Sequence, residues 1–428
     1  MFIWFHPKGL NTKDYINLLV GIDDVVATGE GGYQFSFDGV ERESFNDFLA
    51  LTKEEFRQDS YPEPYIITGT FSDDFNLWYS EYQKNESWSR WLQIGLTKQE
   101  TPQKMEVFQD DSEYPEKETW YLAFLSGIAK DDSDAKTLDL AYSWERFEPS
   151  TIAQIKDALS TTNFESPLDN QEINFNLYDV GQGNMSAITT IDNIPLIYYD
   201  LGGGFFWNAH TYPITKNVCW TLAKTIILSH WDLDHLETAR RLFHRAPNQF
   251  NDKIWIAPIQ NITPYYHKIA TKIASRGHLL LWGNIPRIPF WAGELIKCTG
   301  PNKNHSGLAL TVDLNGSTVL HPADAAYTHI PGILNKQYDG LVATHHGAEF
   351  PINNSPVPNP LSDDGNIAFS YGRNNSYHHP RNESVNAHSI GGWTNVKNTT
   401  NGSISFRTTR ITETPCPNAC DLSVPQSF

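Results

Sequence analysis

Cysteine is scarce in this chain of 428 residues, which contains only four. So few cysteines exclude a disulfide scaffold for a chain of this length. Cys416 and Cys420 form a CxxxC spacing near the C-terminus, and a lone pair of this kind is weak evidence for a metal site or a disulfide. We therefore favour a structural or incidental role for this pair, and the other two cysteines are Cys219 and Cys298.

Long apolar runs are also missing. No stretch of about 18 apolar residues occurs, and such a stretch is what a transmembrane helix requires. The first residues, MFIWFHPKGLNTKDY, have no basic region followed by an apolar run, so they do not resemble a cleaved signal peptide. These absences predict a soluble, cytoplasmic protein with no membrane partner.

Positive charge is in deficit, with 32 Lys and Arg against 50 Asp and Glu, and the formal net charge is -18. An acidic surface repels the phosphate backbone, so non-specific binding of nucleic acid is disfavoured. A nucleic-acid substrate remains compatible with this charge, because bound divalent cations would reverse its sign locally. Hydrophobic residues (39%) and aromatic residues (13%) are plentiful enough for a globular protein with sizeable cores.

Residues 1–165 differ in character from the rest of the chain. They hold most of the acidic and Trp-rich segments, and they include strand-like runs at 65–71 and 119–129. A helix is expected over 149–159, with Ser150 as its N-cap. Because no catalytic constellation occurs here, we predict an accessory α+β domain that binds a protein partner or substrate, or covers the other domain.

The polar segment 163–172 is typical of a linker. Apolar, β-branched runs then follow in quick succession, interrupted by a helical stretch at 236–243. Strands that alternate with helices predict an α/β sandwich over 172–428.

The segment SHWDLDH (229–235) is the strongest chemical signal. It follows directly on the apolar run TIIL and carries His230, Asp232, Asp234 and His235. A buried strand therefore delivers two imidazoles and two carboxylates into one short loop, where functional residues usually lie. Such a cluster is costly to bury without a cation, and mixed nitrogen and oxygen ligands suit Zn, Mn or Fe.

Further polar clusters follow later strands of the same half. They contain Asp324 in STVLHPADA, His345 and His346 in GLVATHHGA, His378 and His379 in SYGRNNSYHHP, and Asn304 and His305 in PNKNHSG. A lone histidine is more often a surface or satisfied core residue than a ligand. Four strand-end clusters in one half of the chain instead predict a shared site.

The order of these motifs resembles the metallo-β-lactamase superfamily. DVGQGN, SHxDxDH, a late Asp, HHG and SYGRNN-Y-HP occur in sequence over 171–393. Within the superfamily the pattern is most similar to the hydrolase domain of ComEC-type DNA-uptake proteins and its stand-alone relatives. The resemblance implies an αββα sandwich and a centre that holds two divalent metal ions, Zn or Mn. The additional N-terminal α+β domain lies outside the resemblance.

Ligands are implied by the resemblance position by position. His230 and Asp232 would bind the first metal, Asp234 and His235 the second, and Asp324 would bridge both.

Further histidines would complete the centre. His345 or His346, together with His379, would complete the second site or contact the substrate, and His305 would be a third ligand to the first metal. The sequence departs from the family at Glu237 and Thr238, where Gly-Gly is usual, and at Ala323, where Gly usually precedes the Asp.

The function implied is a metal-dependent hydrolase, with a phosphodiesterase or nuclease expected. Asp234 would orient a metal-activated hydroxide, and His346 or His379 would stabilise or protonate the leaving oxygen. A short, single-stranded or cyclic nucleic acid or nucleotide suits the acidic chain better than a long duplex. The alternatives are hydrolysis of an ester, thioester or lactone on the same fold, and a non-catalytic component that binds a partner.

Overall fold

The computed structural model describes residues 2–4, 15–27, 32–51, 60–84, 87–109, 117–145, 147–160, 172–213, 223–245, 251–276, 278–348, 356–362 and 365–407. Three of the four cysteines and nearly all of the predicted linker at 163–172 lie outside these ranges. Cys298 is described, and it is a buried free thiol. The chain forms two compact units: unit 1 is Met1–Arg146 with Asn261–Lys272, and unit 2 is Phe147–Gln260 with Ile273–Phe428.

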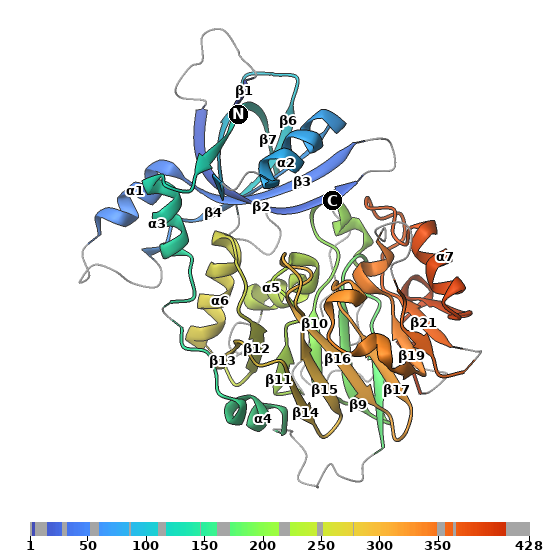
Figure 1. The fold of residues 1–428 in the computed structure, drawn as a ribbon. Helices are drawn as coiled ribbons and strands as arrows, with labels where there is room; N and C mark the ends of the chain where they lie inside the picture. The colour runs from blue at the N-terminus through green and yellow to red at the C-terminus, as the bar shows by residue number, and fades with distance from the viewer. Residues whose placement is uncertain are drawn as a thin grey trace. The chain divides into compact units, whose positions relative to one another are not determined.

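Unit 1 is built on an antiparallel β-barrel. Its described strands follow the order β1-β7-β5-β2-β3-β4-β6, and β6 also pairs with β7, so six strands close into a ring (Figure 1). Closure leaves the short strand β1, which pairs only with β7, as the end of the described sheet, and it limits the edges that invite pairing with another chain. The strands are β1 Phe2–Trp4, β2 Tyr15–Ala27, β3 Tyr33–Glu41, β4 Pro64–Phe71, β5 Trp88–Thr97, β6 Lys104–Gln109 and β7 Lys117–Ala129.

The barrel interior is filled by side chains. Phe37, Ile67 and Ile94 are fully buried in one core, and Trp78 from a helix packs into the same core. The helices of this unit are α1 Arg42–Ala50, α2 Asp73–Lys84 and α3 Ser133–Ala141, and α6 Pro264–Arg276 begins in it. Strands expected at 65–71 and 119–129 are confirmed as β4 and β7, whereas the ring closure was not predicted.

The start of α6 is held by a buried carboxylate. Asp38 on β3 accepts a hydrogen bond from the Thr263 hydroxyl and another from the Tyr265 backbone N–H, the latter at 2.8 Å. The first helical residue is Pro264, which lacks an N–H and suits this position. Asp38 therefore satisfies the otherwise orphaned amide at the helix N-terminus.

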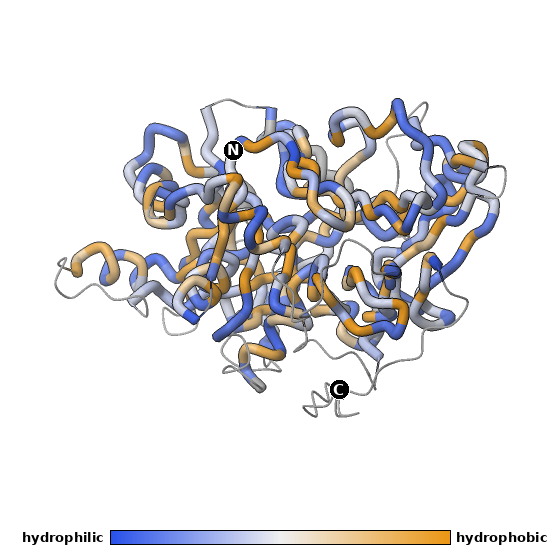
Figure 2. The backbone as a smooth tube through the Cα atoms, turned by 90° about the horizontal axis from the view of Figure 1, so that it is seen from below, coloured by the Kyte–Doolittle hydropathy of each residue, from blue (hydrophilic) through white to orange (hydrophobic). Residues whose placement is uncertain are grey.

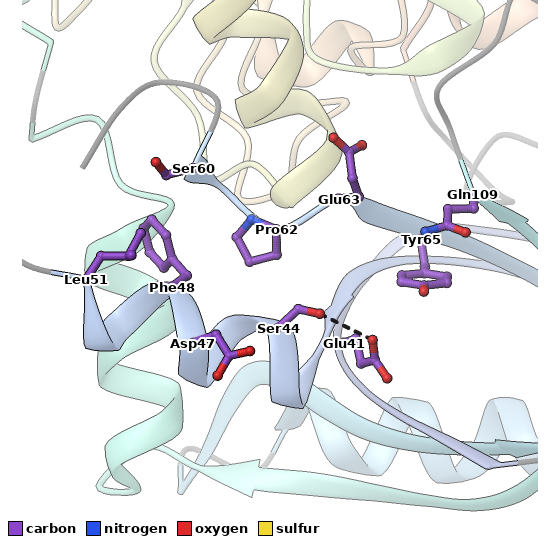
Figure 3. Close-up of a pocket in the computed structure, with 10 residues that line it drawn as sticks. All are labelled: Glu41, Ser44, Asp47, Phe48, Leu51, Ser60, Pro62, Glu63, Tyr65 and Gln109. Atoms are coloured by element: carbon purple, nitrogen blue, oxygen red, sulfur yellow. Dashed lines mark hydrogen bonds between the residues drawn. The ribbon is translucent and has the colours of Figure 1, made fainter. Parts of the chain in front are cut away.

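A cavity of about 490 Å³ opens beside α1 within unit 1 (Figure 3). Glu41, Asp47 and Glu63 bring carboxylates to its lining, but the Ser44 hydroxyl donates to Glu41 at 3.2 Å and Lys268 pairs with Glu63. The residues that line it include no histidine and no cysteine. This cavity therefore lacks the imidazole or thiol ligands of a transition-metal site.

Unit 2 has a mixed α/β architecture with two seven-stranded sheets among its described residues. One sheet has the order β13-β12-β11-β10-β9-β8-β23 and the other β14-β15-β16-β17-β19-β21-β22. The first contains β8 Ile173–Leu177, β9 Met185–Thr190, β10 Pro195–Leu201, β11 Thr225–Ile227, β12 Ile254–Pro258, β13 His278–Trp282 and β23 Ile404–Ser405. The second contains β14 Arg287–Phe290, β15 Gly293–Lys297, β16 Leu308–Asp313, β17 Thr318–His321, β19 Gly340–Val342, β21 Asn366–Phe369 and β22 Asn395–Asn398.

One hydrophobic core joins these two sheets. Phe175 and Ile197 from the first sheet lie in the same buried cluster as Leu310 and Val342 from the second. The helices are α4 Ile152–Ser160, α5 Glu237–Arg245 and α7 Asn382–Ile390, and a two-stranded pair is formed by β18 Gln337–Tyr338 and β20 Asn359–Pro360. The predicted helix at 236–243 is confirmed as α5.

The N-cap predicted for α4 is wrong. Thr151 begins the helix: its hydroxyl accepts from the Gln154 N–H at 3.3 Å, and the Gln154 side chain accepts from the Thr151 N–H at 2.8 Å, which makes a capping box. Ser150 bonds instead to the backbone of Leu281 on β13, in both directions. The contact with β13 therefore uses Ser150, the residue that the local sequence pattern assigns to the N-cap.

Parallel strand pairing creates the edge where the polar clusters meet. Strands β10, β11 and β12 run parallel to one another, as do β17, β19 and β21. Loops that follow parallel strands emerge at the same edge of a sheet, which is where open α/β sheets bind ligands. The loops after β11, β17, β19 and β21 carry the predicted ligands other than His305, which lies between β15 and β16.

Hydrophobic positions occur as short segments interrupted by hydrophilic ones along the tube (Figure 2). No helix among the described residues has both the length and the apolar character that crossing a membrane requires.

Candidate metal centre

The loop after β11 places its histidines inside the protein. β11 is a buried three-residue strand, and a 3-10 turn at Leu233–His235 follows it. Trp231 is fully buried, and its indole N–H donates to the Pro258 carbonyl at 2.9 Å. This anchor turns the neighbouring His230 and His235 inward, where they are 1% and 0% exposed.

Two overlapping groups of ligand atoms lie in unit 2. One consists of His230, His235 and Asp324, and the other of Asp234, His235 and His346, and within each group the atoms lie within 4.8 Å of one another. His235 Nε2 is 3.1 Å from Asp324 Oδ1, and His346 Nε2 is 3.0 Å from Asp234 Oδ2. The structure thus brings together five residues from the loops after β11, β17 and β19.

The Nδ1 atom of each of the three imidazoles, on the side away from the carboxylate oxygens, makes a hydrogen bond. His235 Nδ1 donates to Asp200 Oδ2 at 2.7 Å, and His346 Nδ1 donates to the Ser370 carbonyl at 2.8 Å. Ser229 donates its hydroxyl proton to Asp200 at 2.8 Å, so it accepts from His230 Nδ1 at 3.0 Å. With each Nδ1 protonated, all three rings direct an Nε2 lone pair inward.

The inward atoms fit a cation. His230 Nε2, His235 Nε2, His346 Nε2 and Asp324 Oδ1 are buried and make no hydrogen bond. Nitrogen lone pairs held about 3 Å from carboxylate oxygens repel unless a proton or a metal ion lies between them. Two or three nitrogen and oxygen donors of this kind are a suitable ligand set for a divalent transition metal.

Electrostatics point to the same place. Burial alone would lower the pKa of His235, but Asp324, Asp200 and Asp234 outweigh it and hold that pKa well above its usual value. Burial would raise the pKa of Asp234, yet His235 and His346 lower it to about 2. The surrounding carboxylates therefore favour positive charge at the centre, and a metal cation would displace the protons.

Asp232 does not join either group of ligand atoms. Its Oδ1 accepts from the Leu233 N–H at 2.7 Å, and its Oδ2 lies 3.1 Å from the Lys303 ammonium and 3.9 Å from His230 Nε2. Asp232 is thus beside a lysine as well as beside the first group.

The remaining predicted ligands lie around the centre. His345 Nε2 is 3.5 Å from Asp324 Oδ2, and this side chain is 30% exposed. His379 is buried, and its Nδ1 is 3.2 Å from the Gln182 amide nitrogen. His305 lies outside both groups, and its Nδ1 accepts from the Ala326 N–H at 3.3 Å.

Other residues singled out in the sequence have local roles. His378 is exposed, and the Arg373 guanidinium donates to the Thr400 carbonyl at 2.7 Å. Asp179 accepts from the Gly181 N–H at 3.1 Å and so shapes a turn.

Four of the nine described non-glycine residues with positive φ adjoin this cluster. Asp200, Ala323, His345 and His346 have positive φ values of 61°, 51°, 48° and 55°. Non-glycine residues rarely adopt this region, and they persist in it where the surrounding structure over-determines them, often at functional sites. Ala323 thus has a backbone conformation that glycine would adopt at lower steric cost.

The glycine-rich turn after β10 approaches the ligand loop closely. Asn184 and Gly203 donate their backbone N–H groups to the Asp234 carbonyl, both at 3.0 Å. A Cβ on Gly202 would lie 1.8 Å from that same carbonyl oxygen. Only glycine fits there, and the turn therefore fixes the backbone that carries Asp234.

The side chains of Glu237 and Thr238 do not belong to either group of ligand atoms. Glu237 is fully buried and pairs with Arg240 at 2.7 Å and Arg241 at 2.5 Å. Thr238 donates its hydroxyl to the Gly202 carbonyl at 2.6 Å. These residues brace the start of α5 against the glycine-rich turn and leave the ligand set intact.

Sequence reasoning missed His321 and Lys303. His321 Nδ1 accepts from the Ala323 N–H at 3.1 Å, and its Nε2 donates to Asn184 Oδ1 at 3.2 Å, so it shapes the turn before Asp324. Asn184 belongs to the DVGQGN motif, which was the one available signal. Nothing in the spacing of Lys303 indicates its contact with Asp232.

Comparisons with known proteins give fold likeness only at low identity. No family model matches the chain, and no curated protein matches it. Among solved structures, the metallo-beta-lactamase fold protein YhfI from Bacillus subtilis is 12% identical over 54% of this chain and 99% of its own, with a TM-score of 0.35. CmlA, a diiron beta-hydroxylase from Streptomyces venezuelae, is 12% identical over 56% of this chain and 49% of its own, with a TM-score of 0.24. A variant of the CmlA beta-hydroxylase is 11% identical over 82% of this chain and 74% of its own, with a TM-score of 0.31. Likeness at this level does not establish a family for this chain.

Proposed function

We propose that unit 2 is a metal-dependent hydrolase of the metallo-β-lactamase fold, with an αββα arrangement, that cleaves phosphodiester bonds. The observation that carries the proposal is the convergence of three Nε2 atoms and Asp324 Oδ1, all buried and without a hydrogen bond. The order of the motifs from DVGQGN to SYGRNN, which resembles the ComEC-type hydrolase domain, supports the same assignment.

Two divalent ions, Zn or Mn, are proposed for the centre. His230 and Asp324 would hold one, and Asp234 and His346 the other, with His235 between them. When bound, the ions would polarise a phosphoryl oxygen and make water nucleophilic at neutral pH.

Two side chains are proposed to act on the reacting atoms. Asp234 stays ionised, because its pKa is lowered to about 2, and it can orient the attacking water. His379 accepts from Gln182 at Nδ1, so its Nε2 carries the proton and can donate it to the leaving oxygen. His346 faces the other ligand atoms, so we propose that it binds metal and does not act as the proton donor.

Substrate and partner proposals follow from charge. The net charge of -18 favours a short, single-stranded or cyclic nucleic acid or a nucleotide over a long duplex. Unit 1 is proposed to bind a protein partner or part of the substrate.

A panel of substrates tests the proposal. The full-length protein, loaded with Zn or Mn, would be assayed with bis(p-nitrophenyl) phosphate, cyclic dinucleotides and single-stranded DNA, and with acyl esters and lactones. Asp234→Asn should lower phosphodiester turnover at least about a hundredfold. Asp192→Asn, the same change at an exposed hairpin of unit 2, is the matched control and should be unaffected. Acyl turnover without phosphodiester turnover would contradict the proposal.

A further inference from the structure

Lys303 lies in the loop between β15 and β16, and this loop is tied to the ligand loop. The Gln260 amide donates to the Lys303 carbonyl at 2.6 Å and to the Ser306 hydroxyl at 2.9 Å. The carbonyl oxygen of the same Gln260 side chain accepts from the Trp231 N–H at 3.2 Å. One side chain therefore links the backbone of Lys303 to the residue that follows His230.

A second attachment fixes the end of the same loop. The Leu308 N–H donates to the Ser229 carbonyl at 2.8 Å, and a Cβ on Gly307 would lie 2.4 Å from that oxygen. Because the loop is held at both points, Lys303 has a defined position relative to the centre.

The ammonium group of Lys303 sits at the rim of the centre. Its Nζ is 3.1 Å from Asp232 Oδ2, which is itself 3.9 Å from His230 Nε2. The side chains of Lys303 and Asp232 are 14% and 13% exposed, so both retain access to solvent. In contrast, His230 is 1% exposed.

Charge gives this position a chemical meaning. A lysine beside a cation-binding centre is repelled by the bound cation and is retained by Asp232. An anion bound at the centre would attract both the cation and the ammonium, whereas a neutral ester would gain nothing from the ammonium. Lysine is a common phosphate ligand, acting as a compact point charge with three donors.

We propose that Lys303 is a specificity-determining residue that binds a negatively charged, non-bridging oxygen of the phosphoryl group, while Asp232 holds its ammonium when no anion is bound. The proposal rests on the proposed function, and it deepens that function because it assigns the substrate class to one side chain. Asp232 then positions the Lys303 ammonium through an ion pair, and it also lies beside the proposed metal ligands.

Binding of inorganic phosphate to the metal-loaded, full-length protein tests this without turnover. Lys303→Met should weaken phosphate binding about 10- to 100-fold, the range for a lost hydrogen bond between charged groups. Lys303→Arg should restore most of it. Lys336→Met, at an exposed lysine 3.9 Å from Glu294, is the matched control and should bind like the wild type.

Kinetics and metal content separate this role from a structural one. For Lys303→Met we expect a rise in KM for bis(p-nitrophenyl) phosphate, unchanged turnover of a neutral acyl ester if the wild type has any, and an unchanged metal content. Phosphate binding within twofold of wild type, no phosphate binding by the wild type, or loss of metal from Lys303→Met would each overturn the proposal.

Failure of the proposed function gives a different result. A wild type that binds phosphate through Lys303 but hydrolyses no phosphodiester would contradict the proposed activity and leave the anion site standing.

Discussion

Each unit buries an aspartate, and the two aspartates have different surroundings. In unit 1, Asp38 accepts hydrogen bonds from the Thr263 hydroxyl and the Tyr265 N–H. In unit 2, the Asp324 carboxylate faces four imidazole nitrogens, and its Oδ1 makes no hydrogen bond. Each carboxylate has an Oδ1 without a hydrogen bond, so the difference lies in the groups around them. Asp38 accepts at Oδ2 from donors at the start of a helix, and it therefore serves structure. Asp324 lies among imidazole nitrogens, and this combination of nitrogen and oxygen donors suits a cation.

Backbone conformation separates the two units in the same way. Among the described residues, all non-glycine residues with positive φ lie in unit 2, and Asp200, Ala323, His345 and His346 adjoin the centre. Unit 1 obtains its stability from a regular closed barrel. Unit 2 instead tolerates unfavourable backbone at the loops that aim its ligands.

The largest effect is expected from Asp324→Asn. This change keeps the size of the side chain and removes its charge, so the affinity for Zn or Mn should fall at least about a hundredfold. The metal-dependent rise in Tm, which follows from binding to the folded state, should disappear with it. Calorimetric metal titration and thermal unfolding with and without chelator measure both. A variant that retains metal like the wild type would show that Asp324 resembles Asp38 after all.

A smaller loss is expected from Asp200→Asn. Asp200 accepts from His235 Nδ1 at 2.7 Å and does not face the centre itself. Loss of its charge should weaken metal affinity about 10- to 100-fold, as is typical for the partner of a metal-bound histidine. The same titration would reveal this, and Asp179→Asn, at a turn-forming aspartate, serves as the control. Equal affinities for Asp200→Asn and the wild type would sink the role assigned to Asp200.

Asp38→Ala should act on stability alone. Removal of the carboxylate that caps α6 should lower the free energy of unfolding by about 1–2 kcal/mol, equally with and without metal. Urea unfolding, paired with metal analysis, gives both values. A change in metal content in this variant would break the distinction between the two aspartates.

Ala323→Gly should have the smallest effect and the opposite sign. At a φ of 51°, glycine avoids the steric cost that alanine meets, although it adds entropy to the unfolded chain. We expect stabilisation of at most about 1 kcal/mol, measured by urea unfolding of the metal-free protein. Clear destabilisation would mean that the left-handed backbone at this position is not a source of strain.

Sequence reasoning singled out the residues of the candidate centre because they are concentrated in the sequence. The segment SHWDLDH places His230, Asp234 and His235 in one loop, and the later clusters follow strands whose ends meet at one edge. Local patterns also predicted β4, β7 and α5.

Long-range contacts could not be read from the sequence. The closure of the barrel depends on pairing between β6 and β7. The ion pair of Lys303 with Asp232 joins two residues that are 71 positions apart, from 232 to 303. Left-handed residues were also hidden, because Ala323, His345 and His346 lack the glycine that usually signals a positive φ.

Anomalous diffraction from crystals grown with Zn or Mn is the most direct test of the centre. We expect metal peaks among His230 Nε2, His235 Nε2, His346 Nε2 and Asp324 Oδ1, at about 2.0–2.2 Å from the donor atoms. Data from Asp324→Asn crystals should show weaker peaks or none. A wild-type crystal with no peak there, or with its metal held by other residues, would contradict the assignment of this cluster as the metal centre.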